Sequence, residues 1–524
     1  MLESISTTSL SSPIKLAEWS PKMDLIALTY LNSPETVELR RMDWTKVNSI
    51  TLDSLAIAIC FNPDGRMICV ATSDNKLLLF NIEDSHVLTS MTFYNEITTV
   101  TIDECNGISI TAVGFSDSSV FLFSDFHFSL CRFELTQPAM KISLCENEIF
   151  CLHEDHKTVT CFTLPFIESD APFIKSVSKA FSSYWMHYHK IEKSSAQLID
   201  LWNQIWEESS QFTPHNEDLA RRFLLGQTPP ELATEVHISR LHKSIAHEFT
   251  EMQNILAQDI IVSFIELDKA TEQIKAALDM STKLRINLGS TTSKKQIHNS
   301  LTMLDNLRRL SKCFEALFAF LVKSQNNTQQ AQSQQTPNQT NQDNQETQNY
   351  YFLTKTNVSR SEFADFLVNF FHKFDLLDIS IGEPPDSDPV FQAVHKNDIE
   401  LPYRFSYVNK ERCTCIGPKL VLYDLKQNES KQYDIAGQAL AAYPFGDGDV
   451  GCFSESDGKA IFTMISNCEE EEGQTNQASA EVSLENSTVF FISPRRIALV
   501  ESTELFASVI DLEIPENEDE EDEQ

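Results

Sequence analysis

The chain has 524 residues, enough for more than one domain, because single hydrophobic cores stop growing at about 250 to 300 residues. Its formal net charge of −35 at pH 7 argues against direct binding of nucleic acid or anionic membranes, since both require a concentrated basic surface. We therefore expect protein partners.

The sequence has no feature of a secreted or membrane protein. It starts Met-Leu-Glu-Ser without a basic flank and apolar core, and no run of 18 apolar residues occurs. The 12 cysteines are scattered among apolar positions such as Cys60, Cys69, Cys151 and Cys161, as expected of small buried side chains. We expect a soluble protein of a reducing, intracellular compartment, without a disulfide framework.

Two segments in the first third of the chain repeat at a fixed period. Ser73–Phe80 and Ser116–Phe123 both begin Ser-Asp and end in an apolar run, and fainter copies start at Ser33 and Asp155. The successive spacings are 40, 43 and 39 residues. Polar turn residues followed by a β-branched or aromatic run are typical of a hairpin turn and a buried strand. The period predicts β-propeller blades, and another repeated β architecture is the alternative.

A second marker has the same period. Trp19–Asp24 (Trp-Ser-Pro-Lys-Met-Asp) lies 42 residues before Phe61–Arg66 (Phe-Asn-Pro-Asp-Gly-Arg), and an apolar strand follows each. Strand, Pro/Asp/Gly turn and strand form the centre of a WD40-type blade. The residues that define this motif are Trp19, Pro21, Asp24, Phe61, Pro63, Asp64 and Gly65.

Helical periodicity replaces the strand pattern from about residue 173. Its first segment is rich in aromatic residues, which favour the core of a helical bundle over a ligand cage. These residues are Phe181, Tyr184, Trp185, Tyr188, Ile191, Leu198, Trp202, Ile205 and Trp206. A short helix is expected over Asn216–Leu225, before Gly226 and the Thr228–Pro230 turn. A helix of about 50 residues should follow from Glu231 and end before Gly289.

Two more helices complete the predicted bundle, over Leu301–Leu321 and Ser361–Phe371. The Gln/Asn-rich tract Gln325–Asn349 between them has too few apolar residues to fold, so we expect a disordered loop whose deletion is tolerated. The count fits a four-helix bundle over 173–378.

Strand character returns after the bundle in three weaker units, which start at Lys419, Lys459 and Glu504. Four blades in 1–172 and three in 395–514 make seven, and a propeller must close to leave no sheet edge exposed. The predicted fold is therefore a seven-bladed, WD40-like β-propeller with the α-helical bundle inserted between blades four and five. Two separate β domains flanking a bundle are the alternative.

Acidic runs occur at Glu469–Glu472 and in the tail, 515–524. Such runs are usually solvated and disordered, and a docking strip for a basic surface is the other interpretation.

No pattern in the sequence indicates catalysis, a cofactor or a metal. Phosphate-binding glycine motifs and a Gly-x-Ser-x-Gly elbow are absent, and Cys413 and Cys415 have no second pair at metal spacing. His237, His242 and His247 recur every five residues, so on a helix they cannot converge on one metal. We expect neither an enzyme nor a bound cofactor.

Three segments together resemble subunit 4 of the anaphase-promoting complex: Glu18–Leu28, Phe61–Arg66 and Leu224–Leu232 (Leu-Leu-Gly-Gln-Thr-Pro-Pro-Glu-Leu). The order of propeller, helical domain, propeller and acidic tail is similar to that family as well. The resemblance is strong over 15–85 and 215–260 and thin over 380–500. The Trp-Asp dipeptide of WD40 repeats is absent, which leaves the blade boundaries of the last third open.

The resemblance implies a non-catalytic scaffold in a cullin-RING-type ubiquitin ligase that acts in the cell cycle, in nucleus and cytoplasm. Its implied partners are subunit 1 and the TPR-containing subunit 5, which hold the cullin-like catalytic module relative to the TPR subunits. The candidate contact residues are Leu224, Leu225, Gly226, Pro229, Pro230 and Leu232. A propeller-plus-helix adaptor of a vesicle coat or nuclear pore is the alternative, although such scaffolds usually continue into long α-solenoids.

Overall fold

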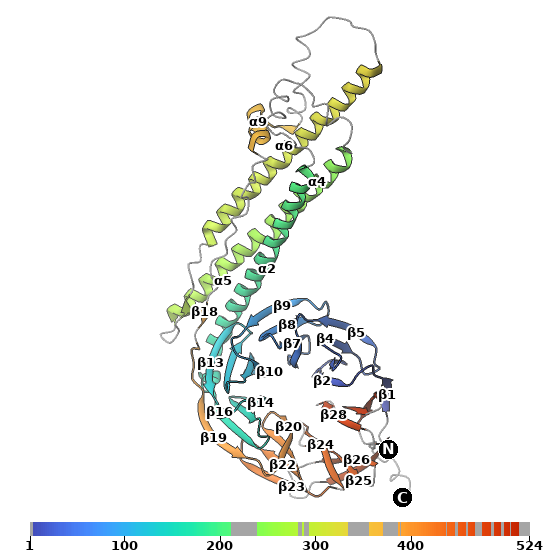
Figure 1. The fold of residues 1–524 in the computed structure, drawn as a ribbon. Helices are drawn as coiled ribbons and strands as arrows, with labels where there is room; N and C mark the ends of the chain where they lie inside the picture. The colour runs from blue at the N-terminus through green and yellow to red at the C-terminus, as the bar shows by residue number, and fades with distance from the viewer. Residues whose placement is uncertain are drawn as a thin grey trace, which may run out of the picture. The chain divides into compact units, whose positions relative to one another are not determined.

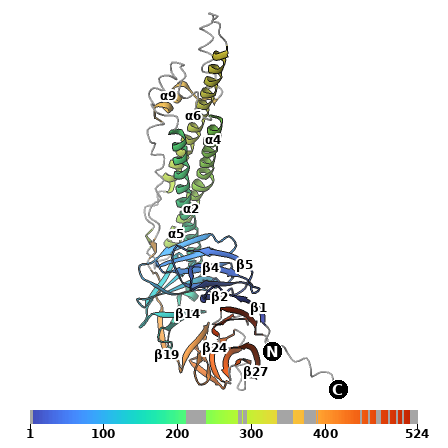
Figure 2. The same ribbon diagram turned by 45° about the vertical axis from the view of Figure 1, so that its right-hand side comes forward.

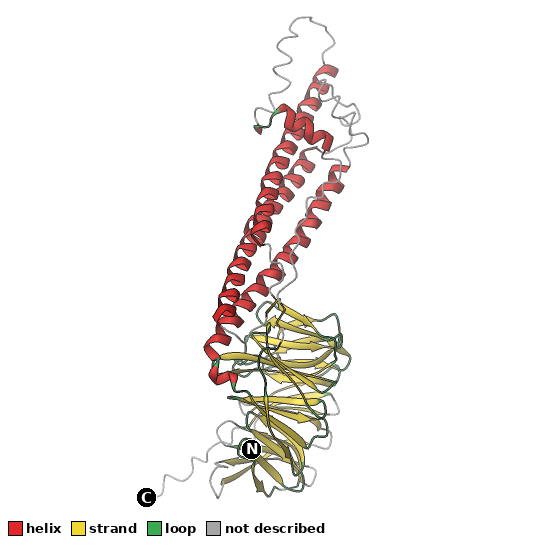
Figure 3. Ribbon diagram, turned by 90° about the vertical axis from the view of Figure 1, so that its left-hand side faces the viewer, coloured by secondary structure: helices red, strands yellow, loops and turns green. Residues whose placement is uncertain are grey.

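The computed structural model describes residues 4–210, 238–280, 286–287, 293–333, 356–369, 386–387, 389–435, 437–445, 449–456, 459–466, 474–483, 487–493, 497–502 and 505–512. The chain divides into two compact units. The propeller unit comprises Met1–Ser182, Ala277–Ile286 and Ser387–Gln524, and the helical unit comprises Ser183–Ala276 and Asn287–Asp386. Strands and helices are largely segregated (Figure 3).

The described residues of the propeller unit form seven four-stranded antiparallel sheets, which Figure 1 shows around a common centre. Blade 1 holds β2 (Ile14–Trp19), β3 (Ile26–Tyr30), β4 (Ser33–Arg40) and β5 (Lys46–Thr51). Blade 2 holds β6 (Ala56–Phe61), β7 (Met67–Thr72), β8 (Lys76–Asn81) and β9 (Val87–Thr92). Blade 3 holds β10 (Ile97–Cys105), β11 (Ile108–Phe115), β12 (Ser119–Ser124) and β13 (Phe128–Glu134). The predicted propeller fold is therefore confirmed.

The other sheets follow along the chain. Blade 5 holds β20 (Arg404–Asn409), β21 (Arg412–Ile416), β22 (Leu420–Asp424) and β23 (Glu429–Tyr433). Blade 6 holds β24 (Gln438–Pro444), β25 (Val450–Ser456), β26 (Lys459–Ser466) and β27 (Gln474–Ser483). Two more sheets each take one strand from a distant part of the chain. The split blade joins β14 (Ala139–Cys145), β15 (Glu148–His153) and β16 (Thr158–Thr163) to β19 (Val394–Glu400). The closing blade joins β28 (Ser487–Ser493), β29 (Ile497–Ser502) and β30 (Phe506–Asp511) to β1 (Ser4–Ser9).

The position of the insertion differs from the sequence prediction. The helical segment leaves the propeller after β16 and the chain returns as β19, the fourth strand of the same sheet. The insertion therefore interrupts one blade, where we expected it between blades four and five. The strand pattern could not reveal this, because β19 is an exposed outer strand with few apolar residues.

Three of the four repeat markers, those that start at Ser73, Ser116 and Asp155, form the same local structure. Each marks the hairpin between the second and third strands of a blade, with a turn residue in the left-handed region: Asn75 at φ 63°, Ser118 at φ 67° and His156 at φ 60°. An aspartate in each turn accepts a hydroxyl hydrogen bond, as Asp74 does from Thr72 at 2.6 Å. Turn chemistry of this kind explains why the repeat is visible in the sequence.

Buried apolar side chains fill the joints between neighbouring sheets. The joint between the closing blade and blade 1 holds Trp19, Ile26 and Leu28 against Leu499 and Val509. Similar clusters join blades 1 and 2, blades 2 and 3, the split blade and blade 5, blades 5 and 6, and blade 6 and the closing blade. Between blade 3 and the split blade, the rings of Phe133 and Phe162 lie 4.3 Å apart.

Long helices make up most of the helical unit. The helices described in the whole chain are α1 (Phe166–Ser169), α2 (Ala171–Ser210), α4 (Ile238–Asn254), the π-helical turn η2 (Ile255–Ile260), α5 (Ile261–Met280), α6 (Ser293–Ser333) and α9 (Arg360–Asn369). The short strands β17 (Ile286–Asn287) and β18 (Asp386–Ser387) pair with each other. Helix α1 and the first turns of α2, up to Ser182, belong to the propeller unit.

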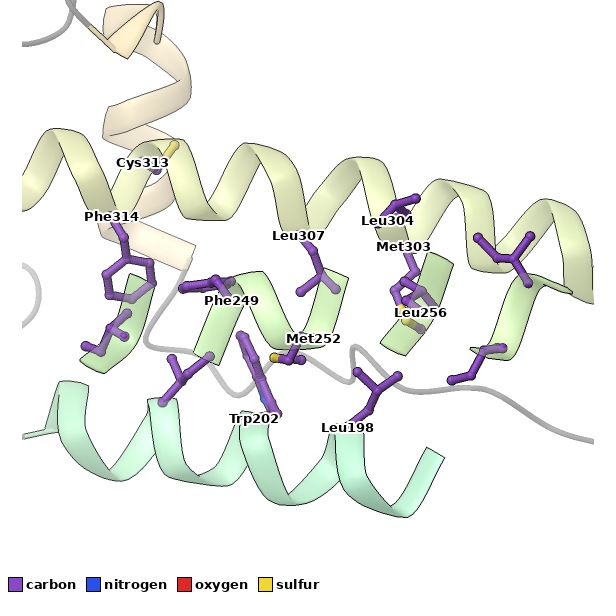
Figure 4. Close-up of a cluster of buried hydrophobic side chains, with 14 of the residues drawn as sticks. Leu198, Trp202, Phe249, Met252, Leu256, Met303, Leu304, Leu307, Cys313 and Phe314 are labelled. Carbon is purple, nitrogen blue, oxygen red and sulfur yellow. The ribbon is translucent and has the colours of Figure 1, made fainter. Parts of the chain in front are cut away.

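Most of the residues predicted for the bundle line its core, whereas Trp185 and Trp206 are only partly buried and Phe181 lies in the propeller unit, where it packs on Phe128. Trp202, Phe249 and Phe314 are almost fully buried and pack with Leu198 and Leu307 between α2, α4 and α6 (Figure 4). The aromatic period therefore signals core packing, as the sequence favoured over a ligand cage.

One helical boundary differs from the prediction. Helix α6 continues through 325–333, the first part of the Gln/Asn-rich tract, and Gln and Ala are good helix formers. The rest of that tract, 334–349, and the expected helix over Asn216–Leu225 lie outside the described residues. Helix α9 begins with a capping box, in which Ser359 Oγ accepts from Glu362 N at 3.2 Å and Glu362 Oε2 accepts from Ser359 N at 3.0 Å.

Candidate interaction surfaces

The two Pro-containing turns of the sequence motif meet at the joint between blades 1 and 2. Gly65 has φ +76°, and a Cβ at this position would lie 2.5 Å from Ser20 Oγ in the equivalent turn of blade 1. Only glycine fits both constraints without strain. Within the second turn, Asp64 Oδ1 accepts a hydrogen bond from Arg66 N at 2.7 Å.

The remaining motif residues also hold blades together. Trp19 is 7% exposed and packs in the joint to the closing blade, whereas Phe61 is 5% exposed and packs between blades 1 and 2. Asp24 Oδ1 accepts from Met42 N at 3.2 Å. Pro21 and Pro63 lie in the two turns, where their fixed φ suits the chain reversal. We assign a structural role to this motif, since its apolar members face neighbouring sheets.

The predicted partner-contact residues, Leu224 to Leu232, lie outside the described residues. Exposed apolar side chains on the described helices offer another candidate surface. Val262 and Ile265 on α5 are 44% and 39% exposed and lie one turn apart, so they share a face. Met186 and Ile199 on α2 and Leu301 on α6 are exposed too.

The split blade is fastened to its fourth strand by side chains as well as by backbone pairing. Lys396 Nζ lies 2.5 Å from Glu148 Oε1, and Thr160 Oγ1 donates to Asp398 Oδ1 at 2.7 Å. Just before β19, the ring of Phe391 stacks on Phe166 at 4.7 Å, which joins the two ends of the insertion. No periodic pattern links positions so far apart, so these residues could not be predicted from the sequence.

The first turns of α2 are anchored to blade 3. Ser178 Oγ donates to Ser124 Oγ at 2.7 Å, and the rings of Phe128 and Phe181 lie 5.4 Å apart. Both phenylalanines are fully buried. The helix that leads out of the propeller therefore starts from a fixed position on blade 3.

Inner strands of four sheets bring ionisable side chains together at the centre of the propeller. Lys141 Nζ lies 5.9 Å from the Tyr407 ring centroid, and the Tyr407 and Tyr443 rings are 4.3 Å apart. Burial raises the pKa of Glu18, and the Lys141 ammonium counteracts that rise. Burial and the Glu18 carboxylate raise the pKa of Tyr407 as well. These groups link blades 1 and 6 to the split blade and blade 5.

His242, His247, Cys413 and Cys415 occupy packed or paired positions. His242 packs on the Phe318 ring at 4.9 Å, and His247 Nδ1 lies 4.0 Å from Glu251 Oε2. Cys413 and Cys415 are buried, and their mutual contact together with burial raises the pKa of the Cys413 thiol. No group of three or more potential metal ligands occurs within the residues that the structure describes. None of the helices in this part of the chain has the length and hydrophobicity of a bilayer-spanning segment.

Comparison with known proteins identifies one domain. Residues 17–105, from the inner strand of blade 1 to the inner strand of blade 3, match the family model of the anaphase-promoting complex subunit 4 WD40 domain. No curated protein matches the chain. The matched segment contains both Pro-containing turns and the first full copy of the repeat. This segment of the chain is therefore similar to the WD40 domain of subunit 4 of the anaphase-promoting complex.

Proposed function

We propose that this chain is a non-catalytic scaffold subunit of the anaphase-promoting complex, a cullin-RING-type ubiquitin ligase of the cell cycle. The observation that carries the proposal is the match of residues 17–105 to the subunit 4 WD40 domain. The fold is compatible with it, since a propeller and a helical unit offer large surfaces for several partners.

In this proposal the chain contributes to the platform that joins the catalytic cullin-like module to the TPR subunits, in nucleus and cytoplasm. Subunit 1 and the TPR-containing subunit 5 are its direct neighbours. The segment Leu224–Leu232 and the exposed apolar side chains of α5 supply contact area on the helical unit. Apolar anchors surrounded by polar residues are the usual centre of such interfaces.

Affinity purification of the tagged full chain from dividing cells, followed by mass spectrometry, tests the proposal. We expect a cullin-like protein, a RING protein and TPR subunits in stoichiometric amounts. Recovery of coat or pore proteins instead, or of no stable partner, would reject it.

A second experiment tests the contact region. The double variant Leu224→Glu/Leu232→Glu should lose subunits 1 and 5 in the same purification, because a charge in an apolar contact is costly to desolvate. Leu31→Glu serves as a matched control, since Leu31 is 59% exposed in a hairpin of blade 1. Unchanged recovery of both subunits with the double variant would remove this turn from the interface.

A further inference from the structure

Two carboxylates from different helices of the helical unit meet on one hydroxyl group. Glu208 lies in the last turn of α2, whereas Ser244 and Glu248 lie one turn apart on α4 and share a face. Ser244 Oγ donates to Glu208 Oε1 at 2.9 Å and lies 3.4 Å from Glu248 Oε1. A serine hydroxyl has a single proton to donate, so it satisfies only one of the two carboxylates at a time.

The second oxygen of each carboxylate is closed off from water. Glu208 Oε2 and Glu248 Oε2 are buried, and neither has a hydrogen-bond partner among the described residues. The surroundings are apolar, since Ile205, Ile245 and Phe249, which neighbour the two glutamates along α2 and α4, are no more than 1% exposed. An ionised carboxylate that loses water without gaining a donor is destabilised, which favours a proton on one of the two groups.

Most of the charges around the pair act in the same direction. Burial raises the pKa of Glu248, and the Glu208 carboxylate raises it further. Glu251 on the same helix adds to the rise, whereas the Ser244 hydroxyl and His247 oppose it. No lysine or arginine in the described ranges forms an ion pair with either carboxylate of the pair. Glu208 also meets the partial negative charge at the C-terminal end of α2.

We propose that Glu208, Ser244 and Glu248 form a proton-operated clasp between α2 and α4. One proton held between the two carboxylates supplies the second donor that Ser244 lacks, so the clasp closes. Loss of this proton leaves two like charges in apolar surroundings, and the clasp opens. Because the folded-state pKa of Glu248 is raised, the contribution of the clasp to stability is complete at low pH and is lost as the pH rises through that pKa.

The clasp joins the two helices on either side of one connection. Residues 211–237 lead from α2 to α4 and include Leu224–Leu232, the segment proposed as a partner contact. An open clasp weakens the packing of the two helices that carry this connection. The proton dependence itself does not depend on which assembly the chain joins.

Hydrogen exchange of the full chain, read by mass spectrometry, tests the clasp, because it reports on each helix separately. In Glu248→Gln the new side chain carries no charge and its amide donates to Glu208. Peptides from 200–210 and 238–254 should therefore exchange about threefold more slowly in this variant than in wild type at about pH 7.5. The difference should narrow at about pH 5.5, where the wild-type pair holds its proton for more of the time.

Glu315→Gln is the matched control, since it makes the same change at an exposed position of α6 and should leave both peptides unchanged. Glu208→Gln should reproduce the effect of Glu248→Gln, and the double variant should add little to either, because one charge is enough to remove the repulsion. Circular dichroism checks that every variant folds. Exchange in Glu248→Gln equal to that of the control, or a difference from wild type that is as large at the lower pH, would overturn the proposal. Neither result would alter the subunit composition found by affinity purification.

Discussion

The split blade and the closing blade hold their outer strands in different ways. Each is a four-stranded sheet that takes its outer strand from a distant part of the chain, β19 after the insertion and β1 from the N-terminal end (Figures 1 and 2). Strand β19 is charged and is held by its backbone ladder to β16 and, in addition, by the side-chain pairs Lys396–Glu148 and Thr160–Asp398. Strand β1 has no charged residue and is held by its backbone ladder to β30 and by the Thr7–Ser508 hydroxyl pair at 2.9 Å.

The interactions that hold the two outer strands differ in their sensitivity to side-chain changes, pH and salt. Backbone pairing depends little on side chains, pH or salt, whereas partly buried ion pairs and charged hydrogen bonds depend on all three. The joint at β1 should therefore fail only when the strand itself is removed. The joint at β19 should respond to single side chains, and it lies where the helical insertion enters the ring.

Removal of β1 should have the largest effect. Deletion of residues 1–10 eliminates the β1–β30 ladder and leaves β30 as an exposed edge. We expect a loss of about 3 to 7 kcal/mol in the free energy of unfolding, measured by urea denaturation, and aggregation during gel filtration. Deletion of 515–524, also ten residues, is the control and should change neither. Equal stability of both truncated proteins would contradict a fastening role for β1.

Phe391→Ala should be the strongest single change at the split blade. It removes the ring that stacks on Phe166, and because Phe391 is only half-buried we expect a loss of about 2 to 3 kcal/mol. Tyr94→Ala is the aromatic control, since Tyr94 is fully exposed, and it should stay within about 0.5 kcal/mol of wild type. Thermal denaturation of both variants measures the difference. A loss no greater than that of the control would mean that the stacked pair does not fasten the insertion.

Lys396→Met should cost about 1 to 3 kcal/mol, because it leaves the Glu148 carboxylate, whose side chain is 10% exposed, without its cation. The double variant with Glu148→Gln should recover most of this loss, and a double-mutant cycle in urea measures it. Lys419→Met, which breaks an exposed pair with Asp434, is the control and should cost less than about 0.5 kcal/mol. Additive losses at positions 148 and 396 would show that the pair contributes nothing.

The smallest effect is a pair of pH dependences of opposite sign. Burial raises the pKa of Glu501 in the closing blade, so its contribution to stability is complete at low pH and is lost as pH rises through the folded-state pKa. The hydrogen bond from Thr160 lowers the pKa of Asp398 in the split blade, so its contribution is complete above the ordinary carboxyl pKa and is lost as pH falls.

Glu501→Gln and Asp398→Asn should each remove one of these dependences. In the first variant the amide oxygen of the new side chain can still accept the hydrogen bond that Ile14 N donates to Glu501 Oε1 at 3.0 Å, so the closing joint stays intact. Stability measured from about pH 4 to about pH 7 should fall less steeply with rising pH in Glu501→Gln, and stability measured from about pH 5 down to about pH 2 should fall less steeply with falling pH in Asp398→Asn. Slopes identical to wild type would show that neither carboxyl titrates with folding.

The sequence predicted the features that depend on neighbouring residues, and it did not predict strand pairing between distant parts of the chain. The repeated turns at Ser73 and Ser116 and the Pro-containing turns before Leu25 and Met67 identified the propeller, because turn residues encode their own geometry. The aromatic period of α2 identified the bundle core. The pairing of β16 with β19 depends on topology, and β19 carries mostly exposed side chains, so no periodic signal marked it.

The same limit applies to the candidate surfaces. The motif residues Trp19 and Phe61 were recognisable because they recur, and they pack between blades. Glu148 and Lys396 are 248 positions apart in the sequence, so only the fold brings them together.

The proposed scaffold function is tested most directly by depleting the chain from the ligase in which we propose that it acts. Depletion of this subunit should leave a cullin-like and RING pair that still transfers ubiquitin in vitro but no longer co-purifies with the TPR subunits. If the catalytic pair lost its own transfer activity, or if it remained bound to the TPR subunits without this chain, the scaffold account would be contradicted.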